Sequence, residues 1–419
     1  MFRTTISQLK PLRLFRHLLI DVLQRAILQM PRGTFVPGDH ELRWMEWHTL
    51  KRLSQVDRQW RNISESTPIM TRSQCHVLTR RIRCLINSKL DIHRLIIDNG
   101  LYFRHVPGGK QMVSPGISAE ATLTAISSMV ALKHLTLRRF YKPDLSILHS
   151  LRQLDSLTIQ YLSHYPRIDL KPLAQMSLSV LSLRHMTLVD YDHLVAPRPT
   201  LVSLTIHTCD VPPNMDSLGK LIGLQRLTIN DCAPLSTLSF LDHLSASLTH
   251  LDLYGSLSHG VDLTSLEGLV GLTDLRLRVN NRNISSLGRL SALKRLCLEG
   301  SWYLTDLSPL AHIPSLLVLD LSRCWSLTCL DVLGTQKHLQ CLVLTECHNI
   351  TDISPIRSCQ MLTSLSINGC EGITDITPIL SCQLLTKIDY HWIMEIPTIC
   401  KPRKLCHISD TDISADIHS

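Results

Sequence analysis

The fourteen cysteines are the residues most able to do chemistry, because thiolates bind metals, form disulfides and act as nucleophiles. Their positions repeat instead of clustering. Seven of them recur at one fixed interval within three sets: Cys209 and Cys232; Cys324, Cys347 and Cys370; Cys359 and Cys382. There is no paired Cys-x-x-Cys, and the histidines do not stand at zinc-finger spacing. We therefore expect buried free thiols, no metal site and a reducing compartment.

Catalytic motifs are missing from the rest of the sequence. There is no Gly-x-Ser-x-Gly nucleophile turn, no phosphate-binding P-loop, no His-Glu-x-x-His zinc motif and no glycine-rich phosphate loop. The 21 histidines are scattered, and none is convincingly paired with a Cys or Ser nucleophile. The sequence predicts a protein that is not an enzyme and that carries no cofactor.

The interval between these cysteines belongs to a repeat with the core Leu-x-x-Leu-x-Leu/Ile. Its first leucines recur at nearly the same interval: Leu132, Leu154, Leu178, Leu201, Leu224, Leu248, Leu272, Leu293, Leu316, Leu339, Leu362 and Leu385. The period of about 23 residues and the core resemble the leucine-rich repeat, whose single units cannot bury their apolar face until neighbours stack. The resemblance implies an α/β solenoid, a horseshoe with parallel strands on the concave face and short helical turns on the convex face. Ser308-Pro309 is interpreted as an N-cap and first-turn proline of one such turn.

The charge is divided unevenly along the chain. The net charge is +8, but residues 1–90 carry 16 Lys and Arg against 6 Asp and Glu. We interpret residues 1–70 as a small helical module, 71–128 as a linker and N-terminal cap with one irregular repeat, 129–395 as the solenoid, and 396–419 as a C-terminal cap and tail. Basic clusters of this kind are usually solvated helix faces, so a nucleic-acid partner is not expected.

The segment from Leu50 to Ser66 has an apolar stripe at helical spacing. The stripe consists of Leu50, Leu53, Val56, Trp60 and Ile63. Together with Ser54, Arg58 and Arg61 it resembles the second half of an F-box, and residues 18–30 supply a candidate first helix. The resemblance implies that these five apolar residues form the hairpin core or face a Skp1-type adaptor of a cullin ubiquitin ligase.

Three other interpretations stay open. The hairpin is alternatively a plain cap on the open end of the solenoid. The late repeats Ile-Thr-Asp-Ile-Ser-Pro-Ile and Ile-Thr-Asp-Ile-Thr-Pro-Ile are similar to those of trypanosomatid leucine-rich-repeat proteins, which implies an intracellular scaffold or regulator. The basic, acid-poor residues 1–33 are alternatively a mitochondrial targeting peptide of an assembly factor. No apolar run is long enough for a membrane span, and we expect a cytoplasmic or nuclear protein.

A partner is expected on the concave face, where positions three, five and seven of each repeat point outward. The candidate partner-binding residues there are Arg138, Arg184, His207, Arg226, His250, Tyr254, Arg276, Arg278 and Arg295. Arginine pairs well with carboxylate and phosphate groups, so the sequence favours an acidic or phosphorylated protein segment. The sequence-based interpretation is a protein-interaction module that serves as substrate receptor of an SCF-type cullin ubiquitin ligase. The alternatives are a scaffold without a ligase role and a mitochondrial assembly factor.

Overall fold

The chain divides into two compact units, residues 1–60 and 61–419, and everything described below belongs to the second unit. The computed structural model describes residues 69–73, 93–99, 102–106, 109–113, 119–140, 143–161, 167–188, 191–195, 200–279, 282–390 and 406–407. Residues 1–68 of the predicted F-box-like module lie outside these residues.

One parallel sheet runs through the described solenoid, and its strands follow chain order except that β3 and β4 form a separate hairpin. The strands of the sheet are β1 (Ile69–Ser73), β2 (Arg94–Asn99), β5 (His134–Arg138), β6 (Ser156–Gln160), β7 (Val180–Arg184), β8 (Ser203–His207), β9 (Arg226–Asn230), β10 (His250–Asp252), β11 (Asp274–Arg276), β12 (Arg295–Cys297), β13 (Val318–Asp320), β14 (Cys341–Val343), β15 (Ser364–Ser366), β16 (Lys387–Asp389) and β17 (Cys406–His407). The predicted solenoid with parallel strands is confirmed.

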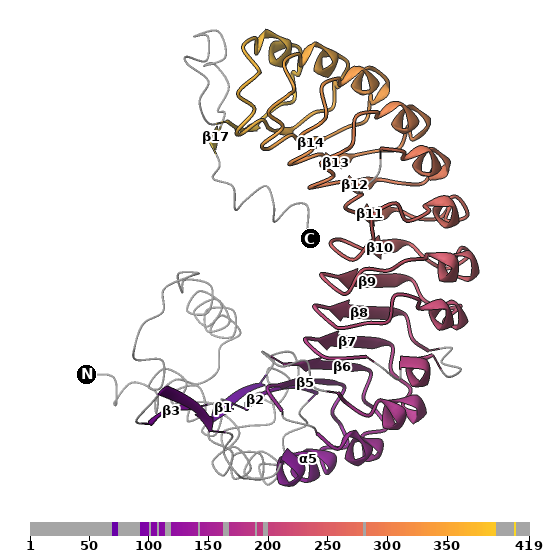
Figure 1. Cartoon of the computed structure of the whole chain (residues 1–419), viewed down its shortest axis with the longest axis vertical. Coiled ribbons are helices and arrows are strands. Elements are labelled where there is room, and N and C mark those ends of the chain that lie inside the picture. The colour runs from indigo at the N-terminus through magenta and orange to yellow at the C-terminus, as the bar shows by residue number, and fades with distance from the viewer. Residues whose placement is uncertain are drawn as a thin grey trace, which may run out of the picture. The chain divides into compact units, whose positions relative to one another are not determined.

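The sheet has this register because each repeat places its leucines on one face of a short strand. Leu204 of β8 pairs with Leu227 of β9, and Leu227 pairs with Leu251 of β10. All three side chains are buried, whereas the residues that flank them in the strands are at least partly exposed. A continuous leucine spine therefore fills the interior, and the strands line the inner, concave side of the solenoid (Figure 1).

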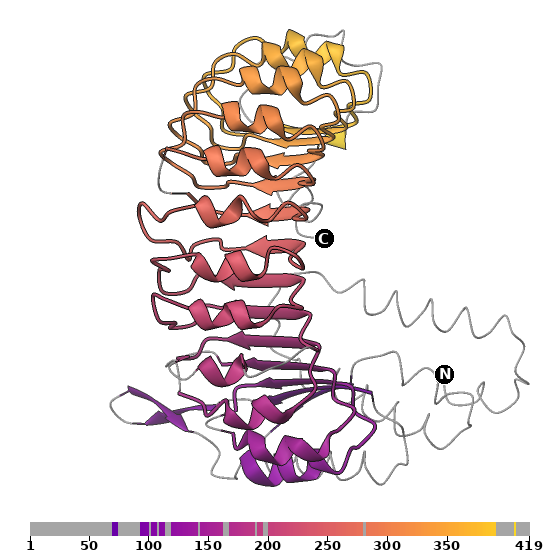
Figure 2. The ribbon, with the colours of Figure 1, turned by 90° about the vertical axis from the view of Figure 1, so that its right-hand side faces the viewer.

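Short 3₁₀ turns cover the convex side, stacked one per repeat (Figure 2). They are η2 (Leu145–Ser150), η3 (Lys171–Gln175), η4 (Tyr191–Leu194), η5 (Asp216–Lys220), η6 (Ser239–His243), η7 (Thr264–Leu266), η8 (Ser285–Arg289), η9 (Ser308–His312), η10 (Asp331–Thr335), η11 (Ser354–Ser358) and η12 (Thr377–Ser381). Pro309, Pro355 and Pro378 occupy the first turn, where a missing N–H does no harm.

The cap of these turns differs from the sequence-based expectation. The Ser308 hydroxyl does not cap η9; the side chain of Asp306 does. Its Oδ1 accepts from the Ser308 N–H at 2.8 Å, and its Oδ2 accepts from the Ser308 hydroxyl at 2.9 Å. Asp352 and Asp375 accept from the equivalent N–H groups of η11 and η12. The aspartate carboxylate accepts this bond because it lies two residues before the donor, the spacing at which an Asx turn forms.

Strand β2 lies ahead of the first regular leucine core, within residues 71–128, where the sequence predicts one irregular repeat. β2 pairs in parallel with β5, with Leu95 opposite Leu135. Between them the chain makes an antiparallel hairpin, β3 (Tyr102–Val106) and β4 (Gly109–Val113), and then helix α5 (Ala119–Ser127). The hairpin interrupts the usual period, which hides this repeat from a spacing argument. Within the described residues, no helix combines the length and the apolar character needed to cross a bilayer.

Candidate functional site

The concave surface presents its side chains in parallel rows, because the strands pair without offset. Arg226 lies opposite Ser203 on one side and His250 on the other, and His250 lies opposite Asp274. The nine predicted concave residues lie on strands β5 and β7 to β12, or two residues after β10 and β11 in the case of Tyr254 and Arg278. They spread over many repeats, and the structure brings only some of them into contact.

Three of the predicted arginines, Arg138, Arg184 and Arg226, have no carboxylate partner among the described residues. Arg138 is half-buried, and its Nε has no hydrogen-bond acceptor. The Nε of Arg184 donates only a long 3.4 Å bond to the hydroxyl of Ser182, and Arg226 is exposed. Burial lowers the pKa of His207, which lies on the strand between Arg184 and Arg226. This stretch therefore offers free guanidinium groups to an acidic ligand.

In the central repeats the charges pair with each other across neighbouring strands. Asp274 accepts from Arg295 at 3.2 Å and lies 3.3 Å from His250. Glu299 pairs with Arg276 at 3.1 Å and with Arg323 at 3.7 Å, and Arg323 also meets Glu346 at 3.0 Å. The predicted candidates Arg276 and Arg295 are therefore already neutralised, which the spacing of basic residues alone does not reveal.

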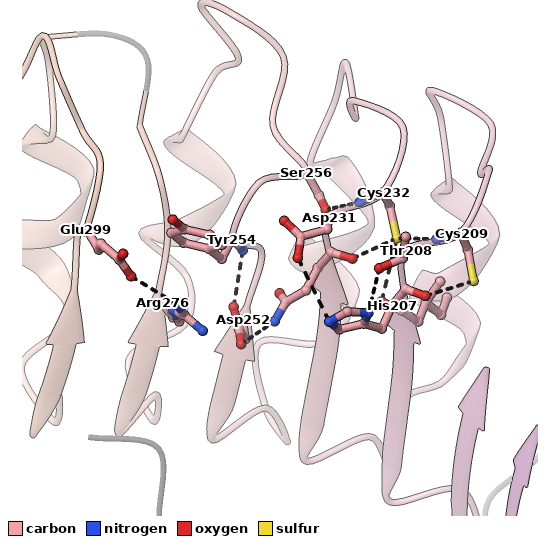
Figure 3. A network of polar contacts seen from close by, with 12 residues as sticks. His207, Thr208, Cys209, Asp231, Cys232, Asp252, Tyr254, Ser256, Arg276 and Glu299 are labelled. Atoms are coloured by element: carbon pink, nitrogen blue, oxygen red, sulfur yellow. Dashed lines mark hydrogen bonds and ion pairs between the residues drawn. The ribbon is translucent and has the colours of Figure 1, made fainter. Parts of the chain in front are cut away.

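A polar network connects the two regions (Figure 3). The side-chain amide of Asn230 donates to Asp252 at 2.7 Å, and the same carboxylate accepts from the backbone N–H of Tyr254 at 3.1 Å. On the other side, His207 lies 3.9 Å from Asp231 and 2.7 Å from the Thr208 hydroxyl. The network fixes the side chains of the central strands before any partner arrives, which reduces the entropy cost of binding.

Aromatic and arginine side chains form a second feature, which we call the arginine–tryptophan patch: Tyr254, Arg276, Arg278, Trp302 and Trp325. The Cζ of Arg276 lies 4.2 Å from the centroid of the Tyr254 ring. The Cζ of Arg278 lies 5.5 Å from the same centroid and 5.7 Å from that of Trp302. Trp302 stacks on Trp325 with centroids 5.2 Å apart and an interplanar angle of 7°. Such contacts between arginine and aromatic faces are cation–π interactions.

Sequence reasoning missed Trp302 and Trp325. Both follow their strand by several residues and so fall outside positions three, five and seven. The available signal was the spacing between the two tryptophans, since it equals the interval between the ladder-forming cysteines Cys324 and Cys347. With 38% and 43% of their surfaces exposed, they are too open to count as core residues.

The turns after the strands hold a recurring left-handed residue. Glycine occupies this position at Gly255, Gly300 and Gly369, but Arg323 and Glu346 adopt it with φ of 59° and 58°. A non-glycine residue pays a steric cost in this region. The shared conformation places Arg323 and Glu346 beside each other at the edge of the concave surface, next to the arginine–tryptophan patch.

Five of the buried cysteines line the interior side of these turns: Cys209, Cys232, Cys324, Cys347 and Cys370. Each thiol donates to a backbone carbonyl of the preceding repeat: Cys347 to Leu321 at 3.0 Å and Cys370 to Leu344 at 2.8 Å. We call the residues at this position the turn ladder: Cys209, Cys232, Ser256, Ser301, Cys324, Cys347 and Cys370. Burial raises the pKa of the Cys324 thiol to about 12 and that of Cys232 to about 11. These thiols are structural donors and poor nucleophiles at neutral pH.

One group of possible metal ligands occurs among the described residues, and the sequence did not suggest it. Cys297, Glu299 and Asp320 offer ligand atoms within 4.8 Å of one another. The Cys297 thiol donates to Asp320 at 3.5 Å, and burial raises the pKa of the Asp320 carboxyl. Glu299 is paired with Arg276 and Arg323, so one of the two carboxylates of this cluster already has cationic partners.

The predicted adaptor-facing residues lie outside the described part of the chain. They are Leu50, Leu53, Val56, Trp60 and Ile63. Their role stays a prediction from sequence.

Stacked repeats, a parallel concave sheet and convex 3₁₀ turns define the described chain as a leucine-rich-repeat solenoid. No protein-family model and no curated protein matches the chain. An internalin of Listeria monocytogenes matches in structure with a TM-score of 0.53 and 21% identity, over 71% of this chain and 85% of its own. A leucine-rich-repeat protein of Leptospira interrogans matches with a TM-score of 0.46 and 17% identity, over 81% of this chain and 100% of its own. At 21% identity the likeness to the internalin establishes the fold alone.

Proposed function

We propose that the protein binds a segment of another protein on the concave strand face and acts by that binding. The observation that carries the proposal is a set of three strand arginines, Arg138, Arg184 and Arg226, which have no carboxylate partner among the described residues. They project from a sheet whose neighbouring side chains are already ordered by hydrogen bonds. Such a preformed surface suits recognition of an acidic or phosphorylated segment by arginine.

Charge reversal at two of these three arginines tests the proposal. Replacing Arg184 and Arg226 together with Glu should remove partner binding and leave stability nearly unchanged. Arg226 is exposed and Arg184 is half-buried. Neither has an ion pair to lose among the described residues, and substitutions at such surface positions shift the free energy of unfolding by only about 0.5 kcal/mol. The matched control is Arg289→Glu on the convex turn η8, where the arginine is also exposed. Quantitative affinity capture compares the three proteins. Partners retained by both variants would place binding on another surface.

The more specific role is substrate receptor of an SCF-type ubiquitin ligase. Its support is the F-box-like stripe Leu50, Leu53, Val56, Trp60 and Ile63, placed ahead of a solenoid suited to hold a substrate. A Skp1-type adaptor and a cullin are the partners that this role requires. A scaffold with no adaptor and a mitochondrial assembly factor are the competing roles.

Truncation of the stripe separates these roles. If Leu50 and Leu53 face an adaptor, changing both to Ala should abolish recovery of a Skp1-type protein and lower thermal stability only slightly. If they fill a hairpin core, unfolding should become easier by about 2–5 kcal/mol for each buried leucine. A folded wild-type protein that recovers no adaptor supports the scaffold role. Organelle fractionation tests the mitochondrial one.

A further inference from the structure

The arginine–tryptophan patch lies beside the ends of four consecutive strands, β10 to β13. Tyr254 and Arg278 each lie two residues after a strand, and Trp302 and Trp325 lie on the turns that follow β12 and β13. Arg278 lies within cation–π distance of both Tyr254 and Trp302, and Trp302 continues the stack onto Trp325. A planar cation and two stacked indoles thus form one continuous surface across the repeats.

The charges of this surface leave one cation without a partner. Arg276 pairs with Glu299, and Arg323 pairs with Glu299 and Glu346. Arg278 has no carboxylate within ion-pair distance among the described residues, although its guanidinium is held between two rings. A carboxylate is one of the groups whose geometry matches such a prepositioned planar fork.

The patch is preorganised by backbone hydrogen bonds between repeats. The N–H of Ser326 donates to the Trp302 carbonyl at 3.1 Å, and the side chain of Asn349 donates to the Trp325 carbonyl at 2.6 Å. Gly300 leaves room for the arginine, since a Cβ there would lie 3.1 Å from the Arg278 Cδ. Little conformational entropy remains to be lost when a ligand docks.

Stacked tryptophans beside an arginine also suit a single-stranded nucleic acid, but the surrounding charges do not. A polyphosphate backbone needs a continuous basic track. Here Asp274, Glu299 and Glu346 alternate with the arginines along the same repeats. A peptide with a single acidic residue needs only one unpaired arginine, so the neighbouring carboxylates do not repel the rest of it.

We propose that the arginine–tryptophan patch is the anchor point for an extended peptide segment in which an acidic residue stands next to an aromatic or other large apolar residue. The acidic side chain pairs with Arg278, and the apolar side chain covers the faces of Trp302 and Trp325. Tryptophan, tyrosine and arginine are the residues that most often dominate binding energy at protein interfaces. This inference rests on the proposed function, since it names the partner chemistry of the same concave surface.

Selection of peptides tests the anchor. A random dodecapeptide display library is selected on the full-length protein, and the recovered peptides are resynthesised. Their affinities are measured for the wild type, Arg278→Ala, Trp302→Ala and the convex control Arg289→Ala. The expected peptides carry Asp or Glu adjacent to an aromatic or large apolar residue. Their affinity should fall at least about tenfold in the two patch variants and stay unchanged in the control. Unchanged melting temperatures establish that the variants fold.

The outcomes separate this inference from the general one. One outcome is that the peptides lose affinity for the double variant Arg184→Glu and Arg226→Glu but bind Arg278→Ala and Trp302→Ala as tightly as the wild type. This outcome would overturn the anchor and leave the concave-face proposal standing. Peptides indifferent to all concave variants, or no selected peptide at all, would overturn both. An oligouridine that binds more tightly than any selected peptide and loses its affinity in Trp302→Ala would assign the patch to nucleic acid and overturn the peptide anchor.

Discussion

The buried thiols of the turn ladder hold neighbouring repeats together through hydrogen bonds. The position accepts Ser as well as Cys: Ser256 and Ser301 are fully buried, and their hydroxyls accept from the backbone N–H groups of Cys232 and Val279 at 3.0 Å. The regular spacing of the cysteines predicted their burial. It did not predict the serines, because serine is common elsewhere and carries no spacing signal.

At Cys347 the thiol contributes both a buried contact and a hydrogen bond to Leu321. Cys347→Ala should lower the free energy of unfolding by about 1–2 kcal/mol, as the loss of a small buried side chain does. Cys347→Ser should cost less, because the hydroxyl can donate to the same carbonyl. Urea denaturation of the two variants provides the comparison. A serine variant less stable than the alanine variant would show that hydrogen bonding is not what the position requires.

The raised pKa values of the ladder thiols predict a loss of stability in alkali. The pKa of Cys324 is about 12 in the folded chain, against 9.0 ordinarily, so the unfolded chain releases its proton first. The contribution of the protonated Cys324 thiol to the free energy of unfolding is therefore fully present below pH 9 and is lost as the pH rises toward 12. By about pH 10.5 each such thiol should cost up to about 2 kcal/mol. Denaturation curves at about pH 8 and pH 10.5 measure the drop, which should shrink in Cys324→Ser. An equal drop in that variant would assign the effect to other groups.

Repeat spacing also accounts for most of the secondary-structure elements. The Leu-x-x-Leu-x-Leu core predicts the strands from β5 to β16, because a strand buried on one face must alternate. The core does not recur at β2, which lies in the stretch where only one irregular repeat is expected, because the β3–β4 hairpin lengthens that repeat. The sequence also attributes the caps to serines in place of aspartates. Chain spacing reports which residues are buried, but not which of two nearby polar side chains reaches an N–H first.

The aspartate caps should be replaceable by asparagine but not by alanine. Asn283 already serves η8 by accepting from the Ser285 N–H at 2.9 Å, so an amide oxygen suffices. Asp306→Ala should therefore lower the melting temperature, and Asp306→Asn should largely restore it. Hydrogen bonds from Ser308 lower the pKa of the Asp306 carboxyl, so its contribution persists at neutral pH and fades as the pH falls through that lowered value. Equal melting temperatures for the alanine variant and the wild type would show that the bond contributes nothing.

For the whole molecule, the sequence predicts a solenoid with a binding face but not the chemistry of that face. Position counting predicts Arg226 and Arg278 as concave residues, and in the structure they lie on β9 and two residues after β11. It could not show that Arg276 is neutralised by Glu299 while Arg278 is not, because pairing depends on side-chain reach between repeats. Nor could it add Trp302 and Trp325, which act beside the strands instead of on them.

The central claim is that the concave strand face holds the partner, and site-specific photocrosslinking in cells tests it most directly. A photoreactive phenylalanine analogue replaces Thr228 in the middle of β9 in one protein and Arg289 on the convex turn η8 in another. The account predicts that the Thr228 position yields a discrete crosslinked protein, and that charge reversal at Arg184 and Arg226 abolishes this product. It also predicts that the Arg289 position does not yield it. The same product from the Arg289 position, or none from the Thr228 position, would contradict binding on the concave face.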